Sequence, residues 1–225
     1  KIYESAFRRR SDHILTLGQP RNDVFYDQDG RFTTSHQLKK AAKGKKIILY
    51  APTHRQEGKI VFPLKEQFDF EKLNQWCVEH NMVFVIRRHF YHKNEEVDFS
   101  MYSNITDITK KSMDIQEILM DTDILISDYS STYIDYLLLD RPLIFYNFDY
   151  EDYLQNDREM YYDYDEVTPG YKAAIFDELM TELDSIAKDE DHFVEERQRV
   201  RDLFYCKDGQ QMVGEKLLEF LKNLK

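Results

Sequence analysis

Four short runs of the sequence are apolar at almost every position, and they constrain the fold more than any other feature. They lie at residues 46–51, 82–89, 123–127 and 142–148, the second of them ending in charged residues. Strands that are apolar on both faces are typical of a parallel sheet that helices cover on both sides. Patterns with helical spacing alternate with these runs, at residues 68–80, 112–122, 131–140 and from 176 to the end. We therefore predict an α/β class with a Rossmann-like, doubly wound parallel sheet and extra C-terminal helices.

Local signals refine this outline. Asp114 is placed to cap the helix at 112–122, with Glu117 three positions later. Residues 13–18 are predicted to form a short strand and residues 19–23 a turn. Long irregular regions are expected at 88–106 and 159–170, and loops of that length are often functional. Two helices carry apolar stripes: Phe70, Leu73, Trp76 and Cys77 in one, and Met212, Val213, Leu217, Phe220, Leu221 and Leu224 in the last.

Charge and cysteine content exclude several classes of protein. With a net charge of −11 and no long basic block, the chain is not expected to bind nucleic acid or an anionic bilayer. Its two cysteines, Cys77 and Cys206, are too few for a disulfide framework or a Cys-rich zinc site, which favours a reduced, cytosolic compartment. No apolar run approaches the length of a membrane span. The first residue is Lys1 rather than Met, so we expect a fragment or a processed product.

Polar side chains follow each predicted strand, at the edge where open parallel sheets bind their ligands. Together they offer cations, imidazoles and hydroxyls, which suit a phosphate ligand. Neither GxGxxG nor GxxxxGK[ST] is present, so the patterns for NAD and P-loop chemistry are absent. In strand order the residues are Thr53, His54 and Arg55; Arg87, Arg88 and His89; Ser127, Asp128, Ser130, Ser131 and Thr132; and Asn147, Phe148 and Asp149.

The hydroxyl-rich stretch can be interpreted in two ways. A helix that begins near Ser130 presents free backbone N–H groups, and hydroxyls there can donate to phosphate oxygens. Alternatively, Ser130 or Ser131 does no more than cap the helix. Asp128 could orient the loop or meet a ligand, and Asp135 could bond a ribose or cap a neighbour.

The remaining candidates also have competing interpretations. His89 follows two arginines at a strand end, which favours a functional role, whereas His54 and His92 stay open. Arg55 could bind a ligand or pair with a surface carboxylate. The acidic stretch at 163–166 is interpreted as a solvated loop rather than a metal site, because no other ligand pattern accompanies it.

Six motifs occur in the order of a known family: LGQPRND (17–23), YAPTHR (50–55), RRH (87–89), ISDYSSTYIDYLLLDRPLIFY (126–146), YYDYDEVTPG (161–170) and KDG (207–209). This set resembles the CDP-glycerol glycerophosphotransferases, which are bacterial teichoic-acid primases and polymerases, and related capsule polymerases. The resemblance implies a GT-B fold of two Rossmann-like halves, with the donor in the C-terminal half. It assigns residues 1–23 to a junction with a missing N-terminal half, and residues 24–225 to the domain that binds the nucleotide donor.

The resemblance also implies roles for individual residues. His89 resembles the catalytic histidine that contacts the donor phosphates, and Ser130 and Ser131 resemble the hydroxyls at the pyrophosphate. Thr53 and Arg55 resemble the loop on the nucleotide side, and Asp135 a ribose contact. Two departures are the absence of any His-Gly dipeptide and Phe90 in place of a proline. The remaining predicted substrate-binding residues are Arg87, Arg88, Asp128 and Thr132.

The implied reaction is attack of a hydroxyl on the β-phosphorus of CDP-glycerol or a related CDP-polyol, which forms a phosphodiester and releases CMP. The CDP-polyol is a co-substrate, and no metal or cofactor is expected. The acceptor would be a lipid-linked or polymeric glycan held by the missing half, at the inner face of the bacterial membrane. We expect this chain alone to bind a cytidine nucleotide without turnover. Two alternatives stay open: a GT-B glycosyltransferase half that uses an NDP-sugar, and a non-catalytic module with a decayed nucleotide site.

Overall fold

The computed structural model describes residues 2–27, 30–32, 34–53, 64–88, 97–156, 161–205 and 212–223. The chain divides into two compact units, one made of Lys1–Thr33 with Asp202–Lys225 and the other of Thr34–Arg201. The second unit contains the sheet and all the described candidate site residues. The predicted boundary after residue 23 stays a prediction.

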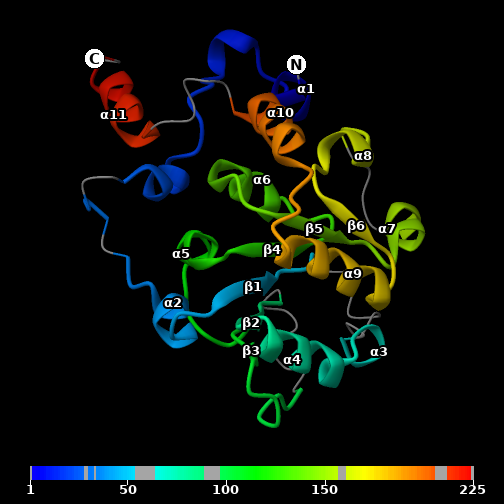
Figure 1. The fold of residues 1–225 in the computed structure, drawn as a ribbon. Helices are drawn as coiled ribbons and strands as arrows, with labels where there is room; N and C mark the ends of the chain where they lie inside the picture. Colours follow the sequence, from blue (N-terminus) through cyan, green and yellow to red (C-terminus); the bar gives the residue numbers. More distant parts are fainter. Residues whose placement is uncertain are drawn as a thin grey trace. The chain divides into compact units, whose positions relative to one another are not determined.

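A six-stranded sheet forms the centre of the larger unit, with the strand order β3-β2-β1-β4-β5-β6 (Figure 1). Every pair of neighbouring strands is parallel, as the sequence predicts. The four predicted strands lie side by side as β2, β1, β4 and β5, so their carboxyl ends share one edge. The strands are β1 Lys46–Tyr50, β2 Met82–Ile86, β3 Ile105–Asp107, β4 Ile124–Ser127, β5 Leu143–Tyr146 and β6 Tyr171–Ala173.

The two edge strands, β3 and β6, were not expected from the sequence. Each has only three residues, too few for a hydrophobic period to be recognised. The start of β6 depends on Gly170, because a Cβ atom at this position would lie 2.5 Å from the carbonyl oxygen of Leu143 in β5. The Pro-Gly pair before β6 therefore allows the backbone to approach its neighbouring strand.

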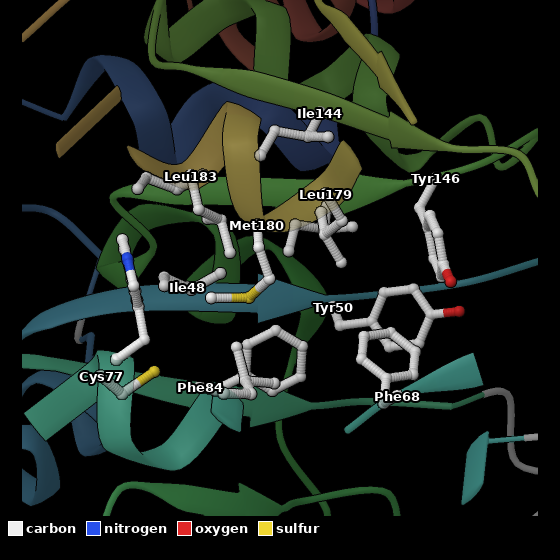
Figure 2. Close-up of a cluster of buried hydrophobic side chains, with 14 of the residues drawn as sticks. Ile48, Tyr50, Phe68, Cys77, Phe84, Ile144, Tyr146, Leu179, Met180 and Leu183 are labelled. Carbon is white, nitrogen blue, oxygen red and sulfur yellow. The ribbon is translucent and has the colours of Figure 1, made fainter. Parts of the chain in front are cut away.

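Helices α4 (Phe70–Glu79) and α9 (Phe176–Ala187) cover one face of the sheet (Figure 1). Figure 2 shows Leu179, Met180 and Leu183 of α9 above side chains that alternate along the strands, such as Ile48 and Phe84. The predicted α4 stripe is buried, including Cys77, whose thiol pKa is raised by burial to about 12. This layer is an apolar core without a reactive thiol.

The opposite face carries α2 (Gln37–Ala42), α5 (Ile115–Asp121) and α6 (Thr132–Tyr136), which continues into a 3-10 turn at Leu137–Leu139. Asp114 caps α5 as predicted, since its carboxylate accepts a hydrogen bond from the backbone N–H of Gln116 at 2.8 Å. Glu117 does not complete the capping box. Its carboxylate instead accepts from the backbone N–H and the hydroxyl of Ser35, before α2.

Polar side chains at the amino edge of the sheet are paired with one another. The guanidinium of Arg197 bonds both carboxylate oxygens of Asp191 and reaches Asp140 at 3.1 Å. Arg141 donates to the carbonyl oxygens of Met120 and Thr122, at the end of α5. These contacts tie the helices to the sheet at the edge opposite the candidate site.

The other helices are short or peripheral. In the larger unit they are α3 Leu64–Gln67, α7 Tyr150–Asn156, α8 Tyr164–Val167 and most of α10 Val194–Phe204. The smaller unit contains α1 Ile2–Phe7, the 3-10 helices Ser11–His13 and Pro20–Tyr26, and α11 Val213–Asn223. Among the described residues, no helix is long and apolar enough to span a bilayer.

The predicted strand at 13–18 is wrong. Residues 11–13 form a 3-10 turn, and residues 14–18 belong to no sheet. The backbone at Ile14 is extended, with φ −120° and ψ 115°, but an extended segment becomes a strand only when another strand accepts and donates its hydrogen bonds. The predicted turn at 19–23 is instead the start of the 3-10 helix at Pro20–Tyr26.

Candidate functional site

The candidate site lies where the sheet changes direction. From β1 the chain goes on to β2 on one side, whereas β4 leads to β5 and β6 on the other. The segments that follow β1 and β4 are therefore neighbours that lead away in opposite directions. In open α/β sheets this switch point, at the carboxyl ends of the strands, is where ligands bind.

Asp128 joins the two segments at the switch point. It follows β4, is only 1% exposed, and accepts from both the backbone N–H and the hydroxyl of Thr53, at 2.8 and 2.6 Å. The same carboxylate accepts from the backbone N–H groups of Tyr129 and Ser130, at 2.6 and 3.2 Å. These four donors tie the segment that follows β4 to the end of β1. Of the two roles that the sequence left open for Asp128, this geometry is that of orienting the loop.

Of the three hydroxyls after Asp128, only that of Ser130 has a described contact with a backbone N–H at the start of α6. Ser131 occupies the N-cap position of α6, yet its exposed side chain makes no capping hydrogen bond. Ser130 donates to the hydroxyl of Thr132 at 2.9 Å and accepts weakly from the Thr132 backbone N–H at 3.3 Å. With only five α-helical residues in α6, a helix dipole contributes little here. The predicted role of the hydroxyls in ligand binding stays a prediction.

Arg87 supplies the positive charge in the described part of the site. Its backbone N–H donates to the carbonyl of Tyr50, which fixes it beside the end of β1. Its guanidinium is partly buried, and the buried Nη1 has no hydrogen-bond partner among the described residues. Burial lowers the pKa of this guanidinium, an effect that the carboxylate of Asp114 partly offsets, but arginine remains charged. A buried donor of this kind can receive an anionic ligand.

Arg88 and Asp135 make structural contacts. The guanidinium of Arg88, which is almost fully buried, bonds Asp107 of β3 at 2.8 Å, and its backbone N–H donates to Thr109. Asp135 is buried on α6, where it accepts from the side-chain amide of Gln116 at 3.3 Å. Their proposed roles in substrate binding stay predictions.

His89, the predicted catalytic residue, and Arg55 lie outside the described residues, as do His54 and His92. Their roles stay predictions as well. The structure does bring Thr53, Arg87, Asp128 and the hydroxyls at 130–132 to the carboxyl ends of adjacent strands.

Sequence reasoning missed a cluster of tyrosines that supports this loop. Tyr129 stacks on Tyr153 of α7, with 3.9 Å between ring centroids, and its hydroxyl donates to Asp149 at 3.1 Å. Tyr164 of α8 donates to the carbonyl oxygen of Asp128 at 3.2 Å. The available signal was the concentration of tyrosines at 129, 150, 153 and 161–164. Spacing along the chain does not reveal that these side chains meet.

Comparison with known proteins places this geometry in a family. The profile of the CDP-Glycerol:Poly(glycerophosphate) glycerophosphotransferases matches residues 1–221. The chain belongs to this family. Two similar relatives make different polymers. This chain is 34% identical over 200 residues to the teichoic acid ribitol-phosphate polymerase TarK of Staphylococcus aureus, and the match covers 86% of this chain and 38% of TarK. It is 37% identical over 179 residues to a teichoic acid poly(glycerol phosphate) polymerase of Bacillus spizizenii, covering 76% of this chain and 44% of that one.

A solved member of the family has the same fold. The wall teichoic acid polymerase TagF, in a variant soaked with CDPG, matches with a TM-score of 0.75 and 30% identity over 99% of this chain and 56% of its own. This likeness and the strand order confirm the predicted Rossmann-like sheet of the GT-B type. The chain spans about half or less of the length of the relatives described here.

Proposed function

We propose that this chain is the donor-binding part of a polyol-phosphate transferase, and that it holds a CDP-activated polyol at the switch point between β1 and β4. The observation that carries this proposal is the Asp128 loop. Its carboxylate is occupied by neutral donors, while the Ser131 hydroxyl is exposed and an Nη1 donor of Arg87 is buried without a described partner. The loop therefore offers donors, rather than acceptors, to a ligand.

This donor-rich edge suits a diphosphate. Phosphate oxygens are strong acceptors, and an arginine with nearby hydroxyls supplies charge-assisted and neutral hydrogen bonds to them. In the proposed reaction an acceptor hydroxyl attacks the β-phosphorus, a new P–O bond forms, and the bond from that phosphorus to the bridging oxygen breaks. The hydroxyl proton passes to a base, and CMP leaves with the bond's electron pair.

In this proposal His89 and the donors around the Asp128 loop stabilise the charge that grows on the bridging oxygen. Loss of one such donor typically costs about 100- to 1000-fold in rate. His89→Ala in the whole enzyme should therefore reduce transfer by about this factor and leave the fold intact. Transfer at the wild-type rate would remove His89 from the proposal.

The direct test is nucleotide binding by the 225-residue chain. We expect calorimetry to show that CMP and CDP bind more tightly than UDP and ADP. Transfer from CDP-glycerol or CDP-ribitol to a polymer acceptor is assayed separately, and we expect none from this chain alone. The relatives make both ribitol-phosphate and glycerol-phosphate polymers, so comparing the two donors in the whole enzyme identifies the polyol.

The other outcomes favour the alternatives. Preferential binding of UDP would indicate a glycosyltransferase half that uses an NDP-sugar. A folded chain that binds no nucleotide would indicate a non-catalytic module.

Three further elements of the proposal concern the whole protein. The acceptor is a lipid-linked or polymeric glycan, so the protein should sediment with the bacterial inner membrane and be released by high salt. No cofactor acts besides the CDP-polyol, so EDTA should leave transfer unchanged. Full dependence on an added divalent cation would contradict this last element.

A further inference from the structure

The hydroxyl loop at 128–132 is held by tyrosines from two short helices that follow β5. Tyr129 stacks on Tyr153 and lies 5.6 Å from Tyr164, measured between ring centroids. Tyr150 in turn lies 5.0 Å from Tyr164. These rings bring α7 and α8 against the segment that follows β4. A loop supported in this way keeps its geometry before any ligand arrives.

Tyr164 makes the most direct contact with the backbone of this loop. Its side chain is buried, its ring lies 6.2 Å from that of Phe145 in β5, and its hydroxyl donates to the carbonyl oxygen of Asp128 at 3.2 Å. Burial, reinforced by the charge of Asp128, raises the pKa of the Tyr164 phenol. The hydroxyl therefore keeps its proton and remains a donor at neutral pH.

Asp128 is consequently held from both sides. Its carboxylate bonds Thr53 at the end of β1 and the amides of Tyr129 and Ser130, whereas its carbonyl is bonded by Tyr164 of α8. Rotation of the peptide unit between Asp128 and Tyr129 would break both the bond from Tyr164 to its carbonyl and the bond from its N–H to the carboxylate. The position of the hydroxyls at 130–132 depends on that peptide unit, because they follow it directly in the chain.

We propose that Tyr164 is a positioning residue that pre-organises the hydroxyl loop for the nucleotide diphosphate, and that this is the role of the tyrosine-rich segment at 161–167. The inference rests on the proposed function for its ligand, but the ordering of the loop can be measured without one. Pre-organisation matters because a loop that must order on binding weakens the observed affinity.

Tyr136 offers a matched control within the same unit. It is also buried, and its hydroxyl also donates to a backbone carbonyl at 3.2 Å, that of Thr122. Thr122 precedes β4, at the amino edge of the sheet, so this bond lies at the opposite end from the hydroxyl loop. Tyr164→Phe and Tyr136→Phe therefore each remove one hydroxyl and one hydrogen bond to a backbone carbonyl, although the carbonyl of Thr122 also accepts from Arg141.

The experiment measures urea stability, amide hydrogen exchange and CMP affinity for the wild-type chain and both variants. Both variants should lose similar stability. Only Tyr164→Phe should speed exchange at the amides of Tyr129 and Ser130 and weaken CMP binding, each by about 3- to 10-fold, which corresponds to one ordinary hydrogen bond. Tyr136→Phe should leave both values unchanged.

Two results would overturn the inference: unchanged loop exchange in Tyr164→Phe, or equal weakening of CMP binding in both variants. If the wild-type chain binds no CMP, the proposed function fails. In that case the exchange rates still decide whether Tyr164 positions the loop.

Discussion

The Arg197 cluster at the amino edge of the sheet and the Asp128 loop at its carboxyl edge use buried polar side chains differently. At the amino edge, Arg197 has a 2% exposed side chain and is bonded by two carboxylates, Asp191 and Asp140. At the carboxyl edge, Asp128 is as deeply buried, and the donors described for its carboxylate are backbone N–H groups and a hydroxyl, while the cationic Arg87 beside β1 has an Nη1 with no partner among the described residues. The opposite charges of the Arg197 cluster neutralise each other inside the protein and serve a structural role. At the carboxyl edge, a buried arginine nitrogen without a described partner follows β2, and an exposed serine hydroxyl follows β4.

One continuous motif, residues 126–146, contributes to both edges. Its first part, Asp128 to Thr132, forms the hydroxyl loop, whereas Arg141 caps the end of α5 through the carbonyls of Met120 and Thr122. The motif therefore combines a functional part and a structural part. Substitutions at the two ends should have different consequences, and this difference can be measured.

The largest expected effect is on stability at the amino edge. Arg197→Met removes the cation and leaves Asp191 and Asp140 without their partner, so we expect a loss of about 3–5 kcal/mol in the free energy of unfolding. Urea denaturation measures this loss. CMP affinity, measured where the variant is folded, should be unchanged.

Arg199→Met is the matched control on the same helix. Arg199 is about half exposed and bonds the carbonyl of Glu166 and the carboxylate of Glu196. Exposed pairs contribute about 0–1 kcal/mol, so its loss should stay in that range. Equal losses of stability in the two variants would show that the buried Arg197 network stabilises the fold no more than the exposed contacts of Arg199 do.

The second prediction concerns the carboxyl edge. Asp128→Asn keeps the shape of the side chain but removes its charge. The amide oxygen can take the place of Oδ1, which accepts from Thr53, Tyr129 and Ser130, whereas the NH₂ group opposes the Thr53 N–H that also contacts Oδ2 at 3.0 Å. We expect a loss of about 1.5–3 kcal/mol in stability, the range for hydrogen bonds to charged groups. CMP affinity should fall by at least about 10-fold, because the loop loses its geometry. Calorimetry that returns wild-type affinity would contradict the role of Asp128.

The third prediction separates binding from folding. Ser131 is exposed and makes no capping bond, so Ser131→Ala should change stability by less than about 0.5 kcal/mol. If its hydroxyl donates to a phosphate, CMP affinity should fall by about 10-fold. Ser185→Ala, at a partly exposed serine on α9 whose hydroxyl donates to the carbonyl of Thr181, is the control. Wild-type affinity in Ser131→Ala would remove that hydroxyl from the site.

The sequence allowed the sheet to be predicted because its central strands are apolar on both faces, and this class of fold places their carboxyl ends along one edge. The order of the strands came from the structure. It could not predict β3 and β6, whose three residues are too few to form a pattern. For the site, the residue types after each strand were sufficient to place Thr53 and Asp128 together. They could not assign Arg88 to Asp107, or Tyr164 to the Asp128 carbonyl, because both pairings depend on side-chain contacts between separate elements.

The smallest expected effect tests whether pairing without burial stabilises the fold. Glu117 is partly exposed, and the hydroxyl and backbone N–H of Ser35 lower the pKa of its carboxyl below 4.5. Because the folded pKa is lowered, its stabilising contribution is present above the unfolded value and is lost as the pH falls through the folded one. The free energy of unfolding of the wild type should therefore exceed that of Glu117→Gln by less than about 1 kcal/mol at pH 7, and this difference should disappear at acid pH. Urea titrations of both chains from pH 7 to about pH 3 measure it. If Glu117→Gln lost as much stability as Arg197→Met, pairing alone would stabilise the fold, whether or not the paired groups are buried.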